Sequence, residues 1–220
     1  MRRSILVLVL LLLLPTAAAA GGAVLYDLPR PIDPKGDYLI YLHGRIIEEE
    51  GPRPTSPRFG VYEYRQILDT FAGRGFTVVS EARPKGTDVA AYAKKVAGQV
   101  RALLAAGVPP ERIAVVGFSK GGGITLAAAA LLREQPKVRF VSLAGCGGGR
   151  KLDLPHPILS LYDAADDLSG SCGEGFSAAP ARTPFEHREI VLHVGRGHGT
   201  FYRPDPAWVE PVVSWLKGRS

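Results

Sequence analysis

The sequence contains no asparagine, so it offers no acceptor for N-glycosylation. It lacks the C-x-x-C and H-E-x-x-H patterns of metal sites, and its five histidines are dispersed along the chain. Neither a G-x-x-x-x-G-K-[ST] nor a G-x-G-x-x-G pattern is present, which argues against a loop that cradles phosphate. We therefore expect no metal and no cofactor.

A large excess of charge of one sign is absent as well. The formal net charge is +6, and two of the positive charges are Arg2 and Arg3. The rest are too few and too dispersed to indicate a nucleic-acid-binding protein. No segment repeats, and the 26 glycines and 18 prolines are scattered rather than periodic. A hydrophobic content of 46% over 220 residues is that of one globular domain.

One long apolar run exists, and it lies at the N-terminus. Ile5–Leu14 follows Arg2 and Arg3 and is too short to cross a bilayer core of about 30 Å as a helix. Ala17–Ala20 then supplies an A-x-A cleavage pattern. We predict a signal peptide over residues 1–20 and an exported protein, periplasmic or secreted, without stable membrane insertion after cleavage. The alternative is a retained N-terminal anchor.

The two cysteines, Cys146 and Cys172, are interpreted in the light of export. An oxidising compartment permits a disulfide between them. Both lie in glycine-rich stretches, AGCGGG and SGSCGEG, rather than in apolar runs. We predict that they are bridged, the alternative being two unpaired core residues.

From Asp37 onward, short apolar runs alternate with segments of helical periodicity. This alternation predicts an α/β domain over residues 37–220, after a lead segment at 21–36, with a mainly parallel sheet of about six strands and helices on both faces. The expected strands are 37–42, 76–80, 112–116, 140–143, 158–161 and 187–194, and the expected helices begin near Tyr64, Val89, Lys120 and Pro206. We expect loops at 45–60 and 169–184, and Pro211 either kinks the last helix or marks its true start.

The pattern Gly117-Phe118-Ser119-Lys120-Gly121 is a G-x-S-x-G motif between an expected strand and a glycine-rich helix. This is the context of a nucleophile elbow, in which a serine at a strained turn projects above the sheet. Side chains at the two flanking positions would collide with neighbouring elements, so both are expected to need glycine. The alternative is a capping serine at a glycine-rich helix start. We predict that Ser119 is a nucleophile.

A serine hydroxyl needs a base to take its proton. His198 lies in Gly195–Gly199, just after the last expected strand, where glycines let the backbone place an imidazole freely. We predict that His198 is the base, the alternative being an exposed loop histidine. The other candidates, assigned to scaffold, core or isolated positions, are His43, His156, His187 and His193.

An acid must orient that imidazole, and three aspartates follow the fifth expected strand. Asp166 is the favoured candidate, followed by Asp163 and then Asp167. At least one of the three is a solvated loop residue. Serine, acid and histidine would then meet at the carboxyl edge of one sheet, where ligands bind in open α/β folds.

The chain resembles the α/β-hydrolase family, in particular a small serine hydrolase without a cap domain. The segments that carry the resemblance are Tyr41–Gly44, Gly117–Gly121, Asp163–Asp166, Gly197–Gly199 and the helix over Trp208–Trp215. The resemblance implies an oxyanion hole formed by the backbone N–H of Lys120 and that of Arg45 or Ile46. Two departures are the near absence of the family's first two antiparallel strands and Asp163 in place of the glycine of the G-x-x-D acid motif.

We therefore expect a serine hydrolase that cleaves carboxylic esters of small molecules through an acyl-enzyme. The alternatives are a peptidase, lipase or thioesterase on the same fold, and a non-catalytic binding protein that keeps the fold. Four cations fall near the expected site: Arg45, Arg83, Lys85 and Lys120. We interpret them as solvated surface charge. The alternative is a site for an acyl group that bears a carboxylate or phosphate.

Overall fold

The computed structural model describes residues 22–147, 151–177 and 187–218, so the predicted signal peptide lies outside the described residues. The strands of the main sheet are β1 (Val24–Leu25), β2 (Tyr38–Leu42), β5 (Thr77–Val79), β6 (Ile113–Phe118), β7 (Arg139–Leu143), β8 (Ile158–Asp163) and β9 (His187–Leu192). The helices are α1 (Arg45–Glu50), α2 (Tyr64–Gly73), α3 (Val89–Ala105), α4 (Lys120–Ala130), α5 (Gly173–Ser177) and α6 (Pro206–Leu216), with 3-10 turns η1 (Pro110–Arg112) and η2 (Gly197–Tyr202). No helix among the described residues is long and apolar enough to cross a membrane.

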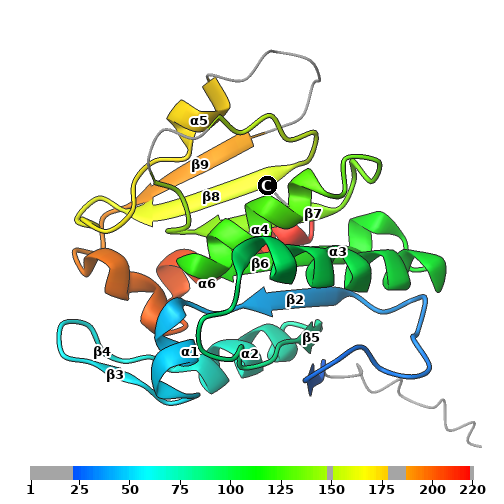
Figure 1. Ribbon diagram of the computed structural model, residues 1–220, viewed down its shortest axis with the longest axis horizontal. Helices are drawn as coiled ribbons and strands as arrows, with labels where there is room; N and C mark the ends of the chain where they lie inside the picture. The colour runs from blue at the N-terminus through cyan, green and yellow to red at the C-terminus, as the bar shows by residue number, and fades with distance from the viewer. Residues whose placement is uncertain (1–21, 148–150, 178–186, 219–220) are drawn as a thin grey trace, which may run out of the picture.

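The sheet runs in the order β1-β5-β2-β6-β7-β8-β9, and its strands pair in parallel (Figure 1). The predicted α/β class with a mainly parallel sheet is confirmed. The sheet has seven strands rather than about six. The additional one, β1, is two residues long and pairs with β5 at the edge, too short to give a recognisable apolar run. Because the strands are parallel, their carboxyl ends meet at one edge.

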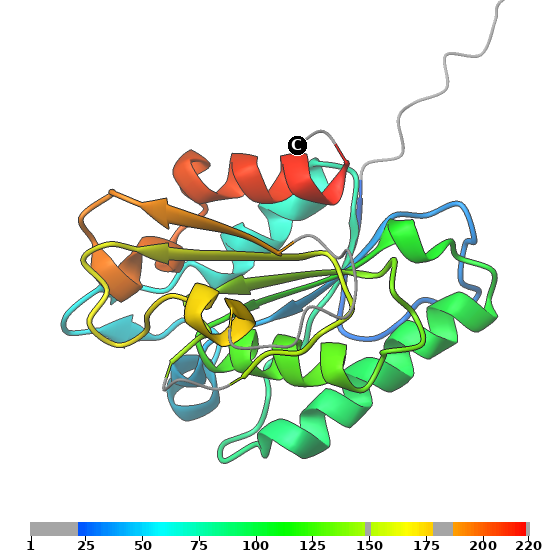
Figure 2. The ribbon, with the colours of Figure 1, turned by 90° about the horizontal axis from the view of Figure 1, so that it is seen from above.

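Each face of the sheet carries its own hydrophobic core. Along β2, Tyr38, Ile40 and Leu42 enter one core, and Leu39 and Tyr41 enter the other, as the two-residue period of a strand requires. Helices α3 and α4 cover the first face, and α2 and α6 cover the second (Figure 2). A strand buried on both faces is apolar throughout, which explains the continuous runs in the sequence.

Two segments expected as loops contain regular structure. Within 45–60 lie α1 and a small antiparallel hairpin of β3 (Thr55–Ser56) and β4 (Gly60–Val61). Helix α1 has six residues and ends in three glutamates, so its sequence shows no apolar face. Tertiary contacts bury part of it nevertheless. Within 169–184, α5 occupies 173–177, and the positions from 178 onward lie outside the described residues.

Helix α6 begins at Pro206 and continues through Pro211. Asp205 caps its first turn by accepting a hydrogen bond of 2.9 Å from the Ala207 N–H. Pro211 cannot donate to the carbonyl of Ala207, but Ala207 is exposed, so water can take the missing donor's place. The helix start is therefore Pro206, and Pro211 is accommodated inside it.

Candidate active site

Ser119 lies in the tight turn between β6 and α4. Its φ of 54° is a left-handed conformation that a residue other than glycine adopts only under strain. A Cβ atom at Gly117 would lie 2.1 Å from the carbonyl oxygen of Gly121, and one at Gly121 would lie 2.0 Å from the carbonyl oxygen of Leu42. The backbone of α4 therefore approaches Gly117 closely, and the backbone of β2 approaches Gly121 closely. Both positions of the G-x-S-x-G motif exclude any side chain.

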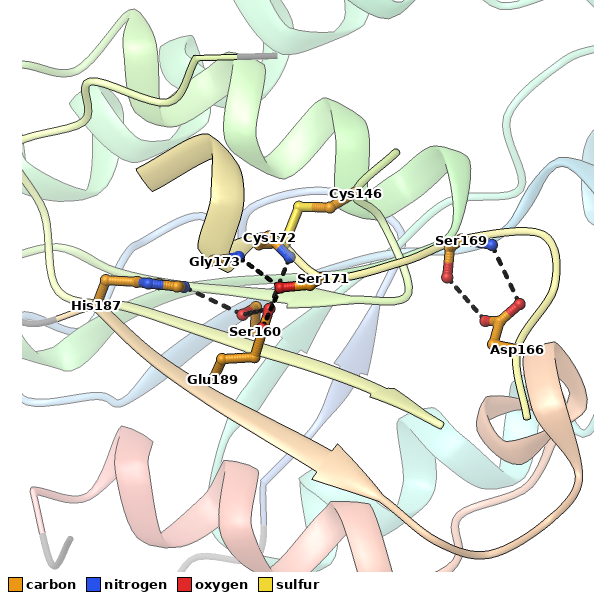
Figure 3. Close-up of a disulfide and its surroundings, with 9 residues drawn as sticks. All are labelled: Cys146, Ser160, Asp166, Ser169, Ser171, Cys172, Gly173, His187 and Glu189. Atoms are coloured by element: carbon orange, nitrogen blue, oxygen red, sulfur yellow. Dashed lines mark hydrogen bonds between the residues drawn. A yellow bond between two sulfur atoms is a disulfide. The ribbon is translucent and has the colours of Figure 1, made fainter. Parts of the chain in front are cut away.

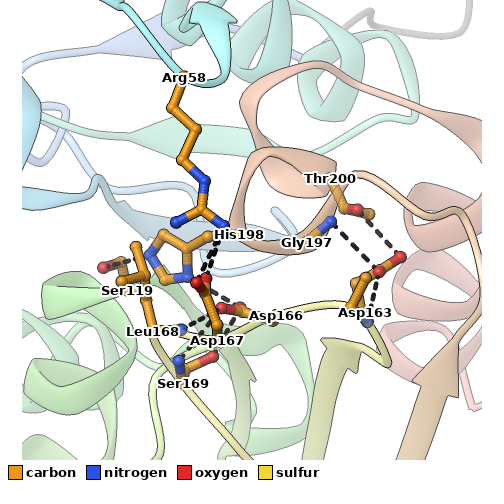
Figure 4. Close-up of polar contacts among 11 residues, drawn as sticks. Arg58, Ser119, Asp163, Asp166, Asp167, Leu168, Ser169, Gly197, His198 and Thr200 are labelled. Atoms are coloured by element: carbon orange, nitrogen blue, oxygen red, sulfur yellow. Dashed lines mark hydrogen bonds and ion pairs between the residues drawn. The ribbon is translucent and has the colours of Figure 1, made fainter.

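His198 reaches Ser119 from the segment that follows β9, the edge strand of the sheet. It lies in η2 after β9, and β9 is three strand positions, about 14 Å, from β6, so the chain after β9 runs back along the sheet edge. The Nε2 atom of His198 lies 2.9 Å from Ser119 Oγ (Figure 4). The ring packs on Phe118 with 4.9 Å between ring centroids, and 9% of the His198 side chain is exposed. The imidazole is thus held against the turn that carries Ser119 and is largely shielded from water.

Asp166 is the aspartate that contacts His198. Its Oδ2 atom lies 2.8 Å from His198 Nδ1, and its side chain is fully buried. The carboxylate also accepts hydrogen bonds from the N–H groups of Leu168 and Ser169, at 2.9 and 3.1 Å, and from the Ser169 hydroxyl at 2.7 Å. These donors satisfy the remaining lone pairs of the carboxylate and fix its orientation.

Asp163 has a different environment. It ends β8, is buried, and accepts hydrogen bonds from one hydroxyl and four backbone N–H groups, those of Thr200, Ala165, Val194, Gly195 and Gly197. Burial would raise the pKa of this carboxyl group, but the hydrogen bonds outweigh burial and hold the pKa below its ordinary value. Four of the five donors belong to the segment that carries His198. Asp163 therefore anchors the histidine loop to the end of β8.

The side chains of the third aspartate and of the remaining histidines form no hydrogen bond with Ser119, His198 or Asp166. Two of these histidines, His43 and His187, support the surrounding structure and are described below. Asp167 is exposed and forms an ion pair of 2.9 Å with Arg58. His156 is buried and donates to the carbonyl of Ala129. His193, expected inside a strand, is exposed just after β9.

A cleft of about 910 Å³ opens above Ser119, a volume suited to a small organic substrate. Arg45 and Lys120, the first residues of α1 and α4, line it together with Ser119. The first N–H groups of a helix have no partner within the helix, so they are available to a ligand. Ile46 is not among the cleft-lining residues, and its side chain packs against the core.

Solved structures with a similar fold include hydrolases and an esterase. The chain superposes on Arabidopsis thaliana SOBER1 with a TM-score of 0.52 at 17% identity, covering 84% of this chain and 99% of that one. Esterase PE8 gives 0.54 at 15% identity over 92% and 96% of the two chains. A sugar hydrolase from Lactococcus lactis gives 0.58 at 12% identity over 88% and 92%. The protein has the α/β-hydrolase fold.

Sequence comparison gives a match over part of the chain. The sequence model of the phospholipase/carboxylesterase family matches residues 76–148, which include β6, the turn that carries Ser119 and α4. A search of curated protein sequences finds no significant match to the chain. This match points to a hydrolase of the esterase type. Within the described ranges, no three His, Cys, Asp or Glu side chains are placed to hold a metal ion.

A disulfide lies beside the cleft. Cys146 and Cys172 are bonded, with 5.2 Å between their Cα atoms (Figure 3). The bond joins the loop after β7 to the loop after β8, which also carries Asp166. Glu189 on β9 also holds Cys172 in place, because its carboxylate accepts a 2.6 Å hydrogen bond from the Cys172 N–H. The loop that carries Asp166 is therefore fastened six residues beyond it.

His187 is part of this support. It stacks on Phe176 of α5 with 3.7 Å between ring centroids, and its Nε2 atom lies 3.1 Å from the hydroxyl of Ser160. Burial lowers the pKa of His187, so the ring is neutral near pH 7. His187 is thus a packing residue beneath α5, away from Ser119.

Two of the four cations near the site are not surface charges, contrary to our interpretation: Arg83 is buried and Lys120 is largely buried. The side chain of Arg83 has no exposure and that of Lys120 has 13%, and both pair with Glu48. Lys85 and Arg45 are exposed. Of the four cations, only Lys85 and Arg45 are therefore the solvated surface charges that we expected.

Sequence reasoning missed the residues that support the site. Ser169 follows Asp166 by three positions, a spacing typical of turns in which an aspartate accepts from later N–H groups, so this signal was present. Glu48 lies in a run of three glutamates that reads as solvated surface. No sequence pattern distinguishes the buried Glu48 from its exposed neighbours.

Replacing Gly121 by alanine should destabilise the fold by about 3 kcal/mol or more, because the new Cβ atom would meet the backbone of β2 and neither element can move freely. Gly98→Ala on α3 is the matched control. It meets nothing within 4 Å, so alanine should raise stability by up to about 1 kcal/mol. Urea unfolding of both variants measures the difference, and a Gly121→Ala protein as stable as wild type would contradict the steric account.

Asp166→Asn and Asp163→Asn should fail in different ways. The first should lower kcat by about 10³- to 10⁴-fold with a small change in melting temperature, because an amide no longer selects the correct imidazole tautomer. The second should lower the free energy of unfolding by about 2 kcal/mol or more, because an amide cannot accept all five hydrogen bonds.

The pH dependence of stability tests the role of the Asp163 charge. Because folding lowers the pKa of Asp163, its stabilisation is present above the unfolded pKa of about 3.9 and is lost as the pH falls through the folded value. The difference in melting temperature between wild type and Asp163→Asn should therefore shrink as the pH is lowered below about 4. A difference that stays constant to pH 2 would count against this role of the charge.

Removing the disulfide in a Cys146→Ser/Cys172→Ser variant should cost about 3 kcal/mol of stability for a bridge across a separation of 26 residues. The acid loop also loses its covalent anchor, so kcat should fall by more than KM rises. Mass spectrometry of the wild type should show the gain of two hydrogen atoms on reduction. An unchanged mass would show that the two thiols are free in the isolated protein.

Proposed function

We propose that this protein is an exported serine hydrolase that cleaves carboxylic esters of small molecules through an acyl-enzyme. One observation carries the proposal: Asp166, His198 and Ser119 form a hydrogen-bonded series that ends at a hydroxyl lining the cleft. The match to the phospholipase/carboxylesterase family points to the same class of reaction.

In the acylation step, His198 acts as the base. A carboxylate can only accept, so Asp166 favours the imidazole tautomer that carries its proton on Nδ1. Nε2 is then free to accept the proton of Ser119 Oγ as that oxygen attacks the ester carbonyl carbon. The tetrahedral intermediate collapses when His198 returns the proton to the leaving alkoxide, which departs as an alcohol. The acyl group remains on Ser119.

In the deacylation step, water takes the place of the alcohol. His198 removes a proton from the water, the hydroxide attacks the acyl carbon, and the proton returns to Ser119 as the carboxylic acid leaves. In both steps the carbonyl oxygen becomes an oxyanion. We assign its stabilisation to the backbone N–H groups of Arg45 and Lys120, which begin two helices beside Ser119. Ile46 is the less favoured donor, because it lies outside the cleft lining.

Export follows from a different set of features. Residues 1–20 have the composition of a cleavable signal peptide. The disulfide beside the cleft supports an oxidising compartment, because such bonds are rare in reducing cytosol. The substrate is therefore met outside the cytosol.

Labelling with a fluorophosphonate tests the nucleophile. The wild type should gain one adduct per chain and hydrolyse p-nitrophenyl acetate, whereas Ser119→Ala should do neither while keeping its melting temperature. Ser177→Ala, which removes an exposed hydroxyl from α5, should behave as wild type. Labelling that persists in Ser119→Ala would refute the assignment.

A panel of substrates tests which type of bond the protein hydrolyses. Oxygen esters, thioesters, peptides and phospholipid vesicles should be compared by kcat/KM. The proposal expects small oxygen esters to be the best substrates. A clear preference for peptides, thioesters or phospholipids in a Ser119-dependent assay would replace the ester assignment with that class.

A further inference from the structure

We propose that Glu48 is a positioning residue for the oxyanion hole: its buried carboxylate ties α1 to the nucleophile turn through Lys120 and to the end of β2 through Arg83. The inference rests on the proposed function, since it concerns the two N–H groups assigned there to Arg45 and Lys120. These donors lie on two separate helices, α1 and α4. Their spacing must be held constant if both are to meet one oxygen atom.

The Glu48 side chain has only 1% of its surface exposed and contacts two cations. Its Oε1 atom accepts a hydrogen bond of 2.9 Å from Arg83 Nε, and its Oε2 atom accepts one of 2.5 Å from Lys120 Nζ. Lys120 directly follows Ser119, so one end of this bridge is the residue whose own N–H faces the oxyanion. The other end is α1, whose first residue is Arg45.

Arg83 fixes the bridge to the sheet. Its guanidinium donates through Nη2 to the carbonyl oxygen of His43, and its backbone N–H donates to His43 Nε2 at 2.8 Å. His43 Nδ1 in turn donates to the carbonyl of Gly44, the residue that precedes α1, at 2.8 Å. Burial and the charge of Arg83 lower the pKa of His43 to about 3, so the ring is neutral and its tautomer is determined by these two contacts.

The start of α1 also lies close to the turn that carries Ser119. A Cβ atom at Gly44 would lie 3.1 Å from the ring of Phe118 and 3.6 Å from the Cβ atom of Ser119. The backbone before Arg45 therefore passes directly beside the nucleophile. A small rotation of α1 would move the Arg45 N–H relative to the Lys120 N–H.

Stability alone is a poor explanation for this network. Taking one anion and two cations out of water is costly, and replacing such a group by apolar side chains is often neutral or stabilising. The group sits behind the two expected oxyanion donors and connects their helices. A rigid connection matters there, because a misplacement of about 1 Å in a catalytic group can cost about 100-fold in rate.

The test uses Glu48→Gln, Lys120→Met, the double variant and Lys120→Arg. Each single variant and the double variant should lower kcat for p-nitrophenyl acetate by about 10- to 100-fold with KM within about twofold of wild type. The double variant should be no slower than the slower single, because both substitutions break one bridge. Lys120→Arg keeps a cation opposite Glu48 and should retain most of the wild-type kcat.

Matched controls are Glu49→Gln, an exposed glutamate on the same helix, and Lys94→Met, an exposed lysine on α3. Both should keep the wild-type kcat. Melting temperatures show which variants fold, and Lys120→Arg supplies a folded comparison if Glu48→Gln does not express. Ser119→Ala belongs in the same series, so that loss of the proposed function is recognised separately.

Three outcomes would overturn the inference while leaving the hydrolase assignment intact. One is a folded Glu48→Gln or Lys120→Met enzyme with the kcat of wild type. Another is singles whose effects on kcat simply multiply in the double variant. The third is opposite changes in the two singles, with activity restored in the double variant. That last pattern would mean that the net charge behind the oxyanion matters and the bridge does not.

Discussion

The geometry of this site depends on one carboxylate that takes no part in the proposed chemistry. His198 follows the last strand of the sheet, and its imidazole has to reach a serine three strands away. The chain can run back along the sheet edge because Asp163 collects backbone N–H groups of that segment at the end of β8. A buried anion that accepts several N–H bonds satisfies donors that would otherwise be left without partners. Once this segment is in place, His198 lies within hydrogen-bonding distance of both Asp166 and Ser119.

Each part of the site is held by a different kind of force. Steric exclusion shapes the turn that carries Ser119, because neighbouring backbone lies so close to Gly117 and Gly121 that no side chain fits there. A covalent bond and a hydrogen bond to Glu189 hold the far end of the acid loop. Buried charge connects α1 to α4. The parallel strands supply the common edge, and two of these anchors, Gly117 on β6 and Glu189 on β9, lie in the strands themselves.

The sequence predicted features that depend on local pattern. The continuous apolar runs indicated a parallel sheet because both faces are covered, and the position of glycines around Ser119 indicated a strand–turn–helix connection. The choice among Asp163, Asp166 and Asp167 was not available from the sequence, because it depends on which way a short loop turns after β8. Helix α1 and Glu48 were missed for a related reason. Their burial arises from contacts with Arg83 and Lys120, far away along the chain.

The left-handed backbone of Ser119 lowers the stability of the fold and places a hydroxyl beside His198. A conformation of this kind costs on the order of 1–3 kcal/mol for a residue with a side chain, and glycine would adopt it freely. A glycine at this position would relax the turn and remove the hydroxyl that contacts His198. The backbone strain is therefore located at the residue whose side chain the turn presents to the cleft.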